Sequence, residues 1–165
     1  MEITVVRGDI CTVHADAVVT AANRELRGGG GVDGAVHAAA GPELVRASRA
    51  LAPCEPGSAV VTPAFRMTTA EWVIHAVGPI YSGPQDEPVL ASAYTASLAR
   101  ADEVGARSVA FPAISTGVYG YPAQDAARVS VAALHGARTE VEQVLLVAFG
   151  ERTARLWEQE LAGWD

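Results

Sequence analysis

Residues 108–149 read SVAFPAISTGVYGYPAQDAARVSVAALHGARTEVEQVLLVAF, and the expected architecture follows from this segment. It opens and closes with apolar, β-branched runs at Ser108–Phe111 and Gln143–Phe149, which predict two strands. The Ala-rich stretch Pro122–Ala137 between them predicts a helix. A strand, a helix and a second strand in this order form a crossover unit, in which the two strands run parallel.

The same alternation covers the rest of the chain. Further strands are predicted at Glu2–Arg7, Ala17–Ala21, Ser58–Thr62 and Trp72–Val77, and further helices at Asp33–Ala40, Pro42–Leu51, Pro88–Val104 and Glu151–Leu161. Residues 58–77 hold two strands with no helix between them, so the mostly parallel sheet is expected to be mixed. Because crossover helices cover both faces of such a sheet, we expect an α/β fold, a three-layer α/β/α sandwich.

Length and composition bound the class of protein. A chain of 165 residues is expected to form a single domain over residues 1–165. Charge, Gly or Pro interrupts every apolar run well before the about 20 residues that a membrane span needs. Met1–Arg7 lacks the features of an export signal. We expect a cytoplasmic monomer with no membrane partner, in which Cys11 and Cys54 are reduced and structural.

The charged residues exclude several chemistries. All 12 cations are arginines and the net charge is −7, so Schiff-base and Walker A lysines are absent and a continuous nucleic-acid groove is not expected. The four histidines show no metal-ligand spacing, and we expect neither a metal nor a cofactor. An anion bound here must be held mainly by backbone N–H groups.

A glycine-rich loop follows the strand at Ala17–Ala21. Residues 23–37 read NRELRGGGGVDGAVH, and four consecutive glycines are unfavourable unless a ligand approaches the main chain closely; a flexible turn is the alternative. Asn23 and Asp33 flank these glycines, where they could orient a sugar hydroxyl and accept a proton. The structural alternatives are an N-cap for Asp33 and a left-handed turn position for Asn23.

A second loop, residues 111–122, also leads from a strand into a helix. Ser115, Thr116 and two glycines can present successive backbone N–H groups to an anion such as a diphosphate, and Tyr119 could cover a ribose. The alternative is an ordinary connection with polar caps. Because the carboxyl ends of parallel strands meet at one edge of the sheet, both loops are expected to border the same crevice.

Three further residues are candidates for the same edge. Asp9, after the first strand, could accept from the amino group of adenine, although an Asx-type cap is equally compatible. Phe149 could stack on a base or pack in the core. His37 lies four residues after Asp33 and could face the crevice or have only a structural role in the helix. Gly29, Gly31 and Gly34 match a dinucleotide-binding GxGxxG, but residues 22–28 separate them from the strand, which disfavours an oxidoreductase.

Together these motifs resemble the macrodomain family and, within it, the MacroD-type ADP-ribosyl hydrolases. The resemblance covers nearly the whole chain, in order, and rests on GDI at 8–10, AAN at 21–23, GGGGVDGAVH at 28–37, AAG at 39–41, VIHAVGP at 73–79 and FPAISTGVYGYP at 111–122. It implies a macrodomain fold with an ADP-ribose pocket. The implied binding residues are Asp9, Ile10, Ala21, Asn23, Gly30, Gly31, Val32, Asp33, Ser115, Thr116, Gly117, Val118, Tyr119 and Phe149.

The resemblance also implies an activity and its substrates. Asp9 and Ile10 would hold adenine, the two loops would clamp the diphosphate, Asn23 would contact the distal ribose, and Asp33 would position or activate water. The expected reaction is hydrolysis of mono-ADP-ribose from a carboxylate ester on protein, from O-acetyl-ADP-ribose or from a nucleic-acid acceptor. The alternative is a reader module that binds the mark without cleaving it.

This chain departs from the family pattern at two points. Thr20 stands where the family commonly has Asn, which could alter the support behind the ribose site. The absence of lysine argues against the branch of macrodomains that uses a lysine for covalent turnover.

Overall fold

In the computed structural model, which describes residues 1–164, one sheet of six strands has the order β1-β6-β5-β2-β4-β3. The strands are β1 (Glu2–Arg7), β2 (Ala17–Ala21), β3 (Ala59–Pro63), β4 (Trp72–Ala76), β5 (Ser108–Phe111) and β6 (Gln143–Ala148). All neighbours pair in parallel except β3 and β4, which are antiparallel. The mixed, mostly parallel sheet predicted from residues 58–77 is therefore confirmed.

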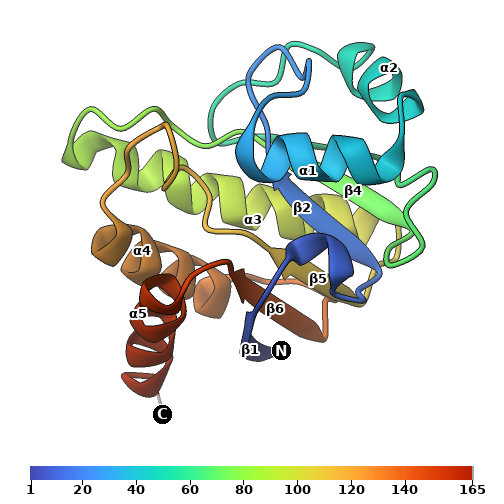
Figure 1. Cartoon of the computed structure of the whole chain (residues 1–165). Coiled ribbons are helices and arrows are strands. Elements are labelled where there is room, and N and C mark those ends of the chain that lie inside the picture. Colours follow the sequence, from blue (N-terminus) through green and yellow to red (C-terminus); the bar gives the residue numbers. More distant parts are fainter. Residues whose placement is uncertain (165) are drawn as a thin grey trace.

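Helices cover both faces of this sheet (Figure 1). They are α1 (Gly31–Ala40), α2 (Glu43–Arg49), α3 (Glu87–Glu103), α4 (Ala123–Gly136) and α5 (Glu151–Ala162), and two 3-10 turns lie at η1 (Ile10–Thr12) and η2 (Pro84–Asp86). α1 and α2 lie on one face, and α3, α4 and α5 lie on the other. The three-layer α/β/α sandwich is thus confirmed. No helix within residues 1–164 is long and apolar enough to cross a membrane.

Alternation along the strands builds two cores. Val19 of β2 and Leu146 of β6 belong to the cluster shared with α3, α4 and α5. Their neighbours Val18 and Val147 belong to the cluster shared with α1 and α2. Because successive side chains of a strand point to opposite faces, each central strand is buried on both sides, which explains its continuous apolar sequence.

Every predicted strand and helix is present, and no end is displaced by more than two residues. The largest consequence is at α1, which begins at Gly31 and not at the predicted Asp33, because Gly30 takes the N-cap position. Asp33 therefore lies inside the first turn, and its interpretation as an N-cap is wrong. β3 extends to Pro63, which is tolerated because β3 is an edge strand whose outer side needs no backbone donor.

Candidate functional site

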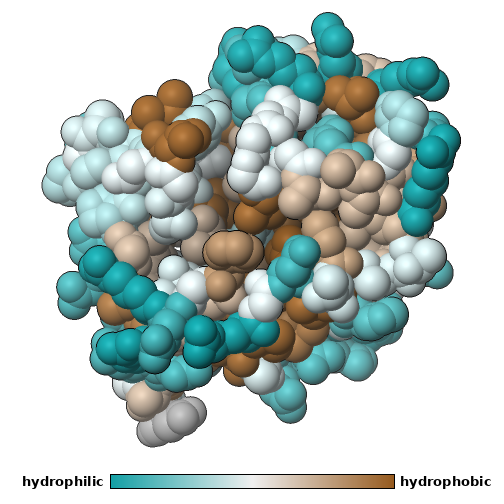
Figure 2. All heavy atoms as spheres, viewed as in Figure 1, coloured by the Kyte–Doolittle hydropathy of each residue, from teal (hydrophilic) through white to brown (hydrophobic). Residues whose placement is uncertain are grey.

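The carboxyl ends of β1, β2, β5 and β6 meet at one edge of the sheet, because these strands are parallel. The loops that follow them are the glycine-rich loop (residues 22–30) and the hydroxyl-glycine loop (residues 112–122), together with the short segments after β1 and β6. In Figure 2 the surface is hollowed between the part over the start of α1 and the part over the hydroxyl-glycine loop. The predicted meeting of the two loops is observed.

Asp33 is the carboxylate nearest the glycines, and it is only 4% exposed. Thr20 Oγ1 donates a hydrogen bond of 2.9 Å to Asp33 Oδ1, and His37 Nε2 lies 3.4 Å from the same oxygen. Burial raises the pKa of Asp33 above its usual value, and the Thr20 hydrogen bond and the field of His37 partly oppose this. The other oxygen, Oδ2, would lie 3.5 Å from a Cβ built on Gly29, so it faces the glycine-rich loop.

Asn23 fixes the glycine-rich loop with both ends of its amide. Its Nδ2 donates to the Gly28 carbonyl oxygen at 2.8 Å, and its Oδ1 accepts from the Arg27 N–H at 3.1 Å. Its Nδ2 would also lie 3.6 Å from a Cβ on Gly29, so Asn23 and Asp33 border the same glycine. Asn23 is a turn residue, but the left-handed conformation predicted as an alternative for it occurs at Leu26, with φ 52°.

The start of α1 presents backbone donors. The first helical bond runs from Gly34 N to Gly30 O at 3.2 Å, and Gly30 has no side chain to cap the turn. Within the described chain the N–H groups of Gly31, Val32 and Asp33 therefore have no acceptor, as expected for the first turn of a helix. A row of N–H groups at a helix N-terminus is suited to an anion.

The hydroxyl-glycine loop presents a second row. The N–H groups of Gly117, Val118 and Tyr119 have no acceptor among residues 1–164. The Ser115 and Thr116 hydroxyls, in contrast, already have acceptors: Ser115 donates to Pro79 O, in the segment that follows β4, and Thr116 donates to Ala113 O within the loop, each at 2.8 Å. The Thr116 N–H donates to Ala113 O at 3.4 Å, so the expectation that Thr116 offers its N–H group to an anion is wrong, and the free row begins at Gly117.

Tyr119 connects this loop to the segment that follows β4. Its backbone oxygen accepts from Tyr81 N at 2.9 Å. Partial burial raises the pKa of the Tyr119 phenol, and the negative charges of Glu25 and Asp33 raise it further. Both carboxylates therefore lie near enough for their charges to act on the Tyr119 phenol.

Asp9 and Phe149 are brought together by the pairing of β1 with β6, in which Arg7 is opposite Ala148. Asp9 Oδ1 accepts from Cys11 N at 2.9 Å, which confirms the Asx-type cap. Ile10 is buried beside it. Phe149 is 89% exposed, so its interpretation as a core residue is wrong and its ring is free to stack on a planar group.

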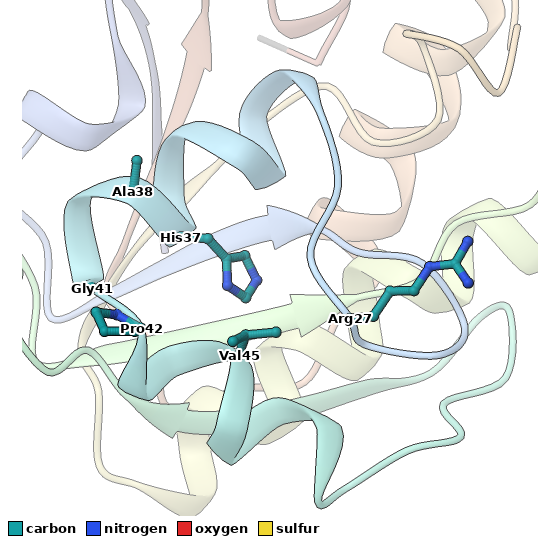
Figure 3. A pocket seen from close by; sticks show the side chains of 6 residues that line it. All are labelled: Arg27, His37, Ala38, Gly41, Pro42 and Val45. Atoms are coloured by element: carbon teal, nitrogen blue, oxygen red, sulfur yellow. The ribbon is translucent and has the colours of Figure 1, made fainter.

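A separate hollow of about 380 Å³ lies between α1, the start of α2 and the glycine-rich loop. Arg27, His37, Ala38, Gly41, Pro42 and Val45 line it (Figure 3). The ring of His37 forms one wall of this hollow. The same ring lies beside Asp33, one turn earlier on α1, so His37 contacts its own helix and also borders the site. No group of three or more His, Cys, Asp or Glu side chains in residues 1–164 is arranged to hold a metal ion.

Two supporting contacts were not foreseen from the sequence. Strand periodicity places Thr20 on the α1 face but does not pair it with Asp33. Ser115 adopts a left-handed φ of 68° against Gly78, 37 positions earlier in the chain. The signals for these contacts were the unusual Thr20 in its motif and the glycine of VIHAVGP, which marks a close approach.

Comparison with known proteins places these features in a family. The Macro domain family matches residues 19–130. A Macro domain-containing protein of Streptomyces nogalater is 47% identical, covering 96% of this chain and 91% of its own length. The O-acetyl-ADP-ribose deacetylase of Citrobacter rodentium is 48% identical, covering 96% of this chain and 94% of its own.

Solved structures agree with these sequence relatives. A point mutant of the Oceanobacillus iheyensis macrodomain with ADPR has a TM-score of 0.91 and 35% identity, covering 97% of this chain and 91% of its own. The Trypanosoma brucei macrodomain in complex with ADP-ribose has a TM-score of 0.88 and 34% identity, covering 97% of this chain and 69% of its own. This chain belongs to the macrodomain family.

Proposed function

We propose that the protein binds ADP-ribose at the carboxyl edge of its sheet and hydrolyses ADP-ribosyl esters. The substrates are O-acetyl-ADP-ribose and proteins that carry mono-ADP-ribose on Asp or Glu. Relatives named O-acetyl-ADP-ribose deacetylase and neighbours solved with ADP-ribose support the ligand and the reaction. The observation that carries the proposal is the buried Asp33 carboxylate, with one oxygen held by Thr20 and the other facing the glycine-rich loop.

The two rows of free N–H groups bind the diphosphate. One row is Gly31–Asp33 at the start of α1, preceded by Gly30, and the other is Gly117–Tyr119. Backbone donors suit this chain because its 12 cations are scattered arginines. The adenine end of the ligand lies at Asp9, Ile10 and Phe149, and the distal ribose lies beyond the diphosphate, beside Ala21 and Asn23.

Asp33 then acts on the linkage at the distal ribose. Asp33 Oδ2 orients a water molecule and takes a proton from it. The water oxygen forms a bond to the carbonyl carbon of the ester at the same time. The ester C–O bond breaks, the proton returns to the departing oxygen, and the products are a carboxylic acid and ADP-ribose. Fixing the diphosphate holds the ester in one position relative to Asp33, which lowers the entropic part of the barrier.

Calorimetry with free ADP-ribose and acetate release from O-acetyl-ADP-ribose test the proposal. Asp33→Ala is expected to retain ADP-ribose binding and to lose at least about 100-fold in turnover, the usual contribution of a general base. Asp125→Ala, which removes an exposed first-turn carboxylate from α4, is the matched control and is expected to behave as wild type.

Each adverse outcome identifies a different error. No heat from millimolar ADP-ribose would show that the pocket assignment is wrong. Saturable binding by the wild type with no release over hours would show a reader module. Full turnover by Asp33→Ala would show that another group performs the proton transfer. Esters, N-linked and nucleic-acid-linked substrates tested side by side identify the acceptor.

A further inference from the structure

Thr20 lies under the first turn of α1, in the middle of the sheet. It is completely buried, and β2 places it opposite His75 of β4. Its backbone neighbours Val19 and Ala21 point to the other face, whereas Val18 and Thr20 point towards α1. The Thr20 hydroxyl therefore reaches Asp33 from below, on the side away from the glycine-rich loop.

The Thr20 hydroxyl has one proton, and that proton is committed to Asp33. The hydrogen bond is 2.9 Å long and buried at both ends. A β-branched side chain in a strand has a restricted χ1, so the direction of the hydroxyl is fixed by the sheet. The ligand-facing oxygen of Asp33 is consequently oriented by a rigid strand, although Asp33 itself belongs to the first turn of a helix.

The other neighbours of Asp33 cannot replace this contact. His37 is 3.4 Å away and approaches the same oxygen, and in its neutral form it donates there only in one tautomer. Arg27 and Glu25 belong to the glycine-rich loop, and Tyr119 comes from the opposite loop. Within residues 1–164, Thr20 is the one side chain whose hydrogen bond to Asp33 is both short and buried.

We infer that Thr20 is a positioning residue for the hydrolysis: its hydroxyl holds Asp33 Oδ1 so that Oδ2 is presented, ionised, to the attacking water. This inference rests on the proposed function. Thr20 is fully buried and its hydroxyl donates to Asp33, so it acts through Asp33. The residue that departs from the family pattern would in this way support the proposed base directly.

Thr20→Val and Thr20→Ser separate the hydroxyl from the packing. Valine keeps the shape and removes the donor, so the ionised carboxylate loses a stabilising partner and its pKa rises further. For Thr20→Val we expect ADP-ribose affinity within about threefold of wild type and a kcat that is lower by about 10-fold. We also expect the acid limb of the kcat profile to be displaced to higher pH. Thr20→Ser restores the donor and is expected to recover both kcat and the wild-type acid limb.

The other titratable and charged groups around Asp33 are unchanged in these variants. They are His37 on α1, His75 on β4, Glu25 and Arg27 in the glycine-rich loop, and Tyr119. Thr62→Val is the matched control, because it removes a buried threonine hydroxyl on β3 that contacts His75 and not Asp33. It is expected to lower stability without moving the acid limb.

The outcomes distinguish this inference from the proposed function. If the wild type hydrolyses the ester and Thr20→Val keeps its kcat and its acid limb, Thr20 is merely structural. If the wild type neither binds ADP-ribose nor releases acetate, the proposed function itself fails. Circular dichroism and ADP-ribose affinity establish that each variant is folded. Should Thr20→Val not fold, Thr20→Ala carries the same expectation, and a serine variant slower than Thr20→Ala would contradict the inference.

Discussion

Gly78 and Ser115 are packed so tightly that no side chain fits on Gly78. A Cβ built there would overlap Ser115 Oγ and lie 2.6 Å from Ile114 Cγ2. The adjacent Pro79 carbonyl accepts the Ser115 hydroxyl at 2.8 Å. The chain leaving β4 thus supports the hydroxyl-glycine loop from behind and determines where its free N–H groups lie.

Gly78→Ala is therefore expected to displace that loop. We expect ADP-ribose affinity to fall at least about 10-fold and the free energy of unfolding to fall by about 1–3 kcal/mol, the usual range for overpacking. Calorimetry and urea unfolding measure the two effects. The control is Gly136→Ala, since a Cβ on Gly136 meets nothing within 4 Å. Wild-type affinity in Gly78→Ala would show that the loop does not depend on this contact.

Gly34 is a helical glycine at which alanine is expected to be harmful. In an ordinary helix interior, Gly→Ala stabilises by about 0.5–1 kcal/mol. A Cβ on Gly34 would instead lie 2.7 Å from the Gly29 carbonyl oxygen, so the glycine-rich loop must move away from α1. We expect Gly34→Ala to lower both the melting temperature and ester turnover. An increase in melting temperature, as expected for Gly136→Ala in α4, would contradict this.

Asp33 is expected to lower the stability of the protein at neutral pH. Burial raises its folded-state pKa above the unfolded value near 3.8, so the folded protein holds the proton more tightly and loses stability as pH rises through these two values. Asp33→Asn cannot ionise and can still accept from Thr20. It is expected to melt at a higher temperature than wild type at pH 7, with a difference that shrinks towards pH 4. An equal difference at both pH values would mean that ionisation is not the cause.

His75 is expected to make the fold sensitive to acid. Burial, aided by the charge of His37, lowers the pKa of His75 from 6.5 to about 3. The stability that neutral His75 contributes to the fold is therefore fully present above the unfolded pKa and is lost as pH falls from 6.5 towards 3. This difference between the folded and unfolded pKa values lowers the free energy of unfolding by about 2 kcal/mol between pH 7 and pH 5. Urea unfolding at both pH values measures it.

His75→Leu should remove that pH dependence, although its stability at pH 7 will also change. Thr62 keeps a partner in this variant, because its hydroxyl donates to the Pro63 carbonyl. His14→Gln, at an exposed position, is the control and should retain the wild-type slope. An unchanged slope in His75→Leu would assign the acid sensitivity to the carboxylates.

The sequence predicted the layers, the mixed sheet and the meeting of the two loops, because hydrophobic periodicity and parallel strands determine these features. Helix starts were less accurate, and the glycines before α1 show why: Gly30 and Gly31 can begin a helix without any side-chain cap, so Asp33 did not mark its start. The start of this helix depends on the conformational freedom of the glycine backbone, and a run of glycines does not indicate at which residue the helix begins.

The orientation of individual side chains could not be predicted. Ser115 belongs to a loop expected to bind an anion, yet its hydroxyl is directed inwards because Gly78 and Pro79 lie against it. Thr20 was recognised as unusual, but its partner lies across the interface between a strand and a helix. Both cases depend on contacts between distant segments, and no local pattern contains them.

The rows of N–H groups at Gly31–Asp33 and Gly117–Tyr119 are main chain, and this has a consequence for how the molecule tolerates change. An amide proton does not titrate at physiological pH and survives every side-chain replacement except proline. Affinity for a diphosphate should accordingly change little with pH and with side-chain replacements that leave the backbone of the two loops in place. Replacements at Thr20 and Asp33, in contrast, should change the reaction of the bound ligand. Binding of the ligand and catalysis therefore depend on different parts of the chain, the backbone of two loops and a few side chains, and each can change without the other.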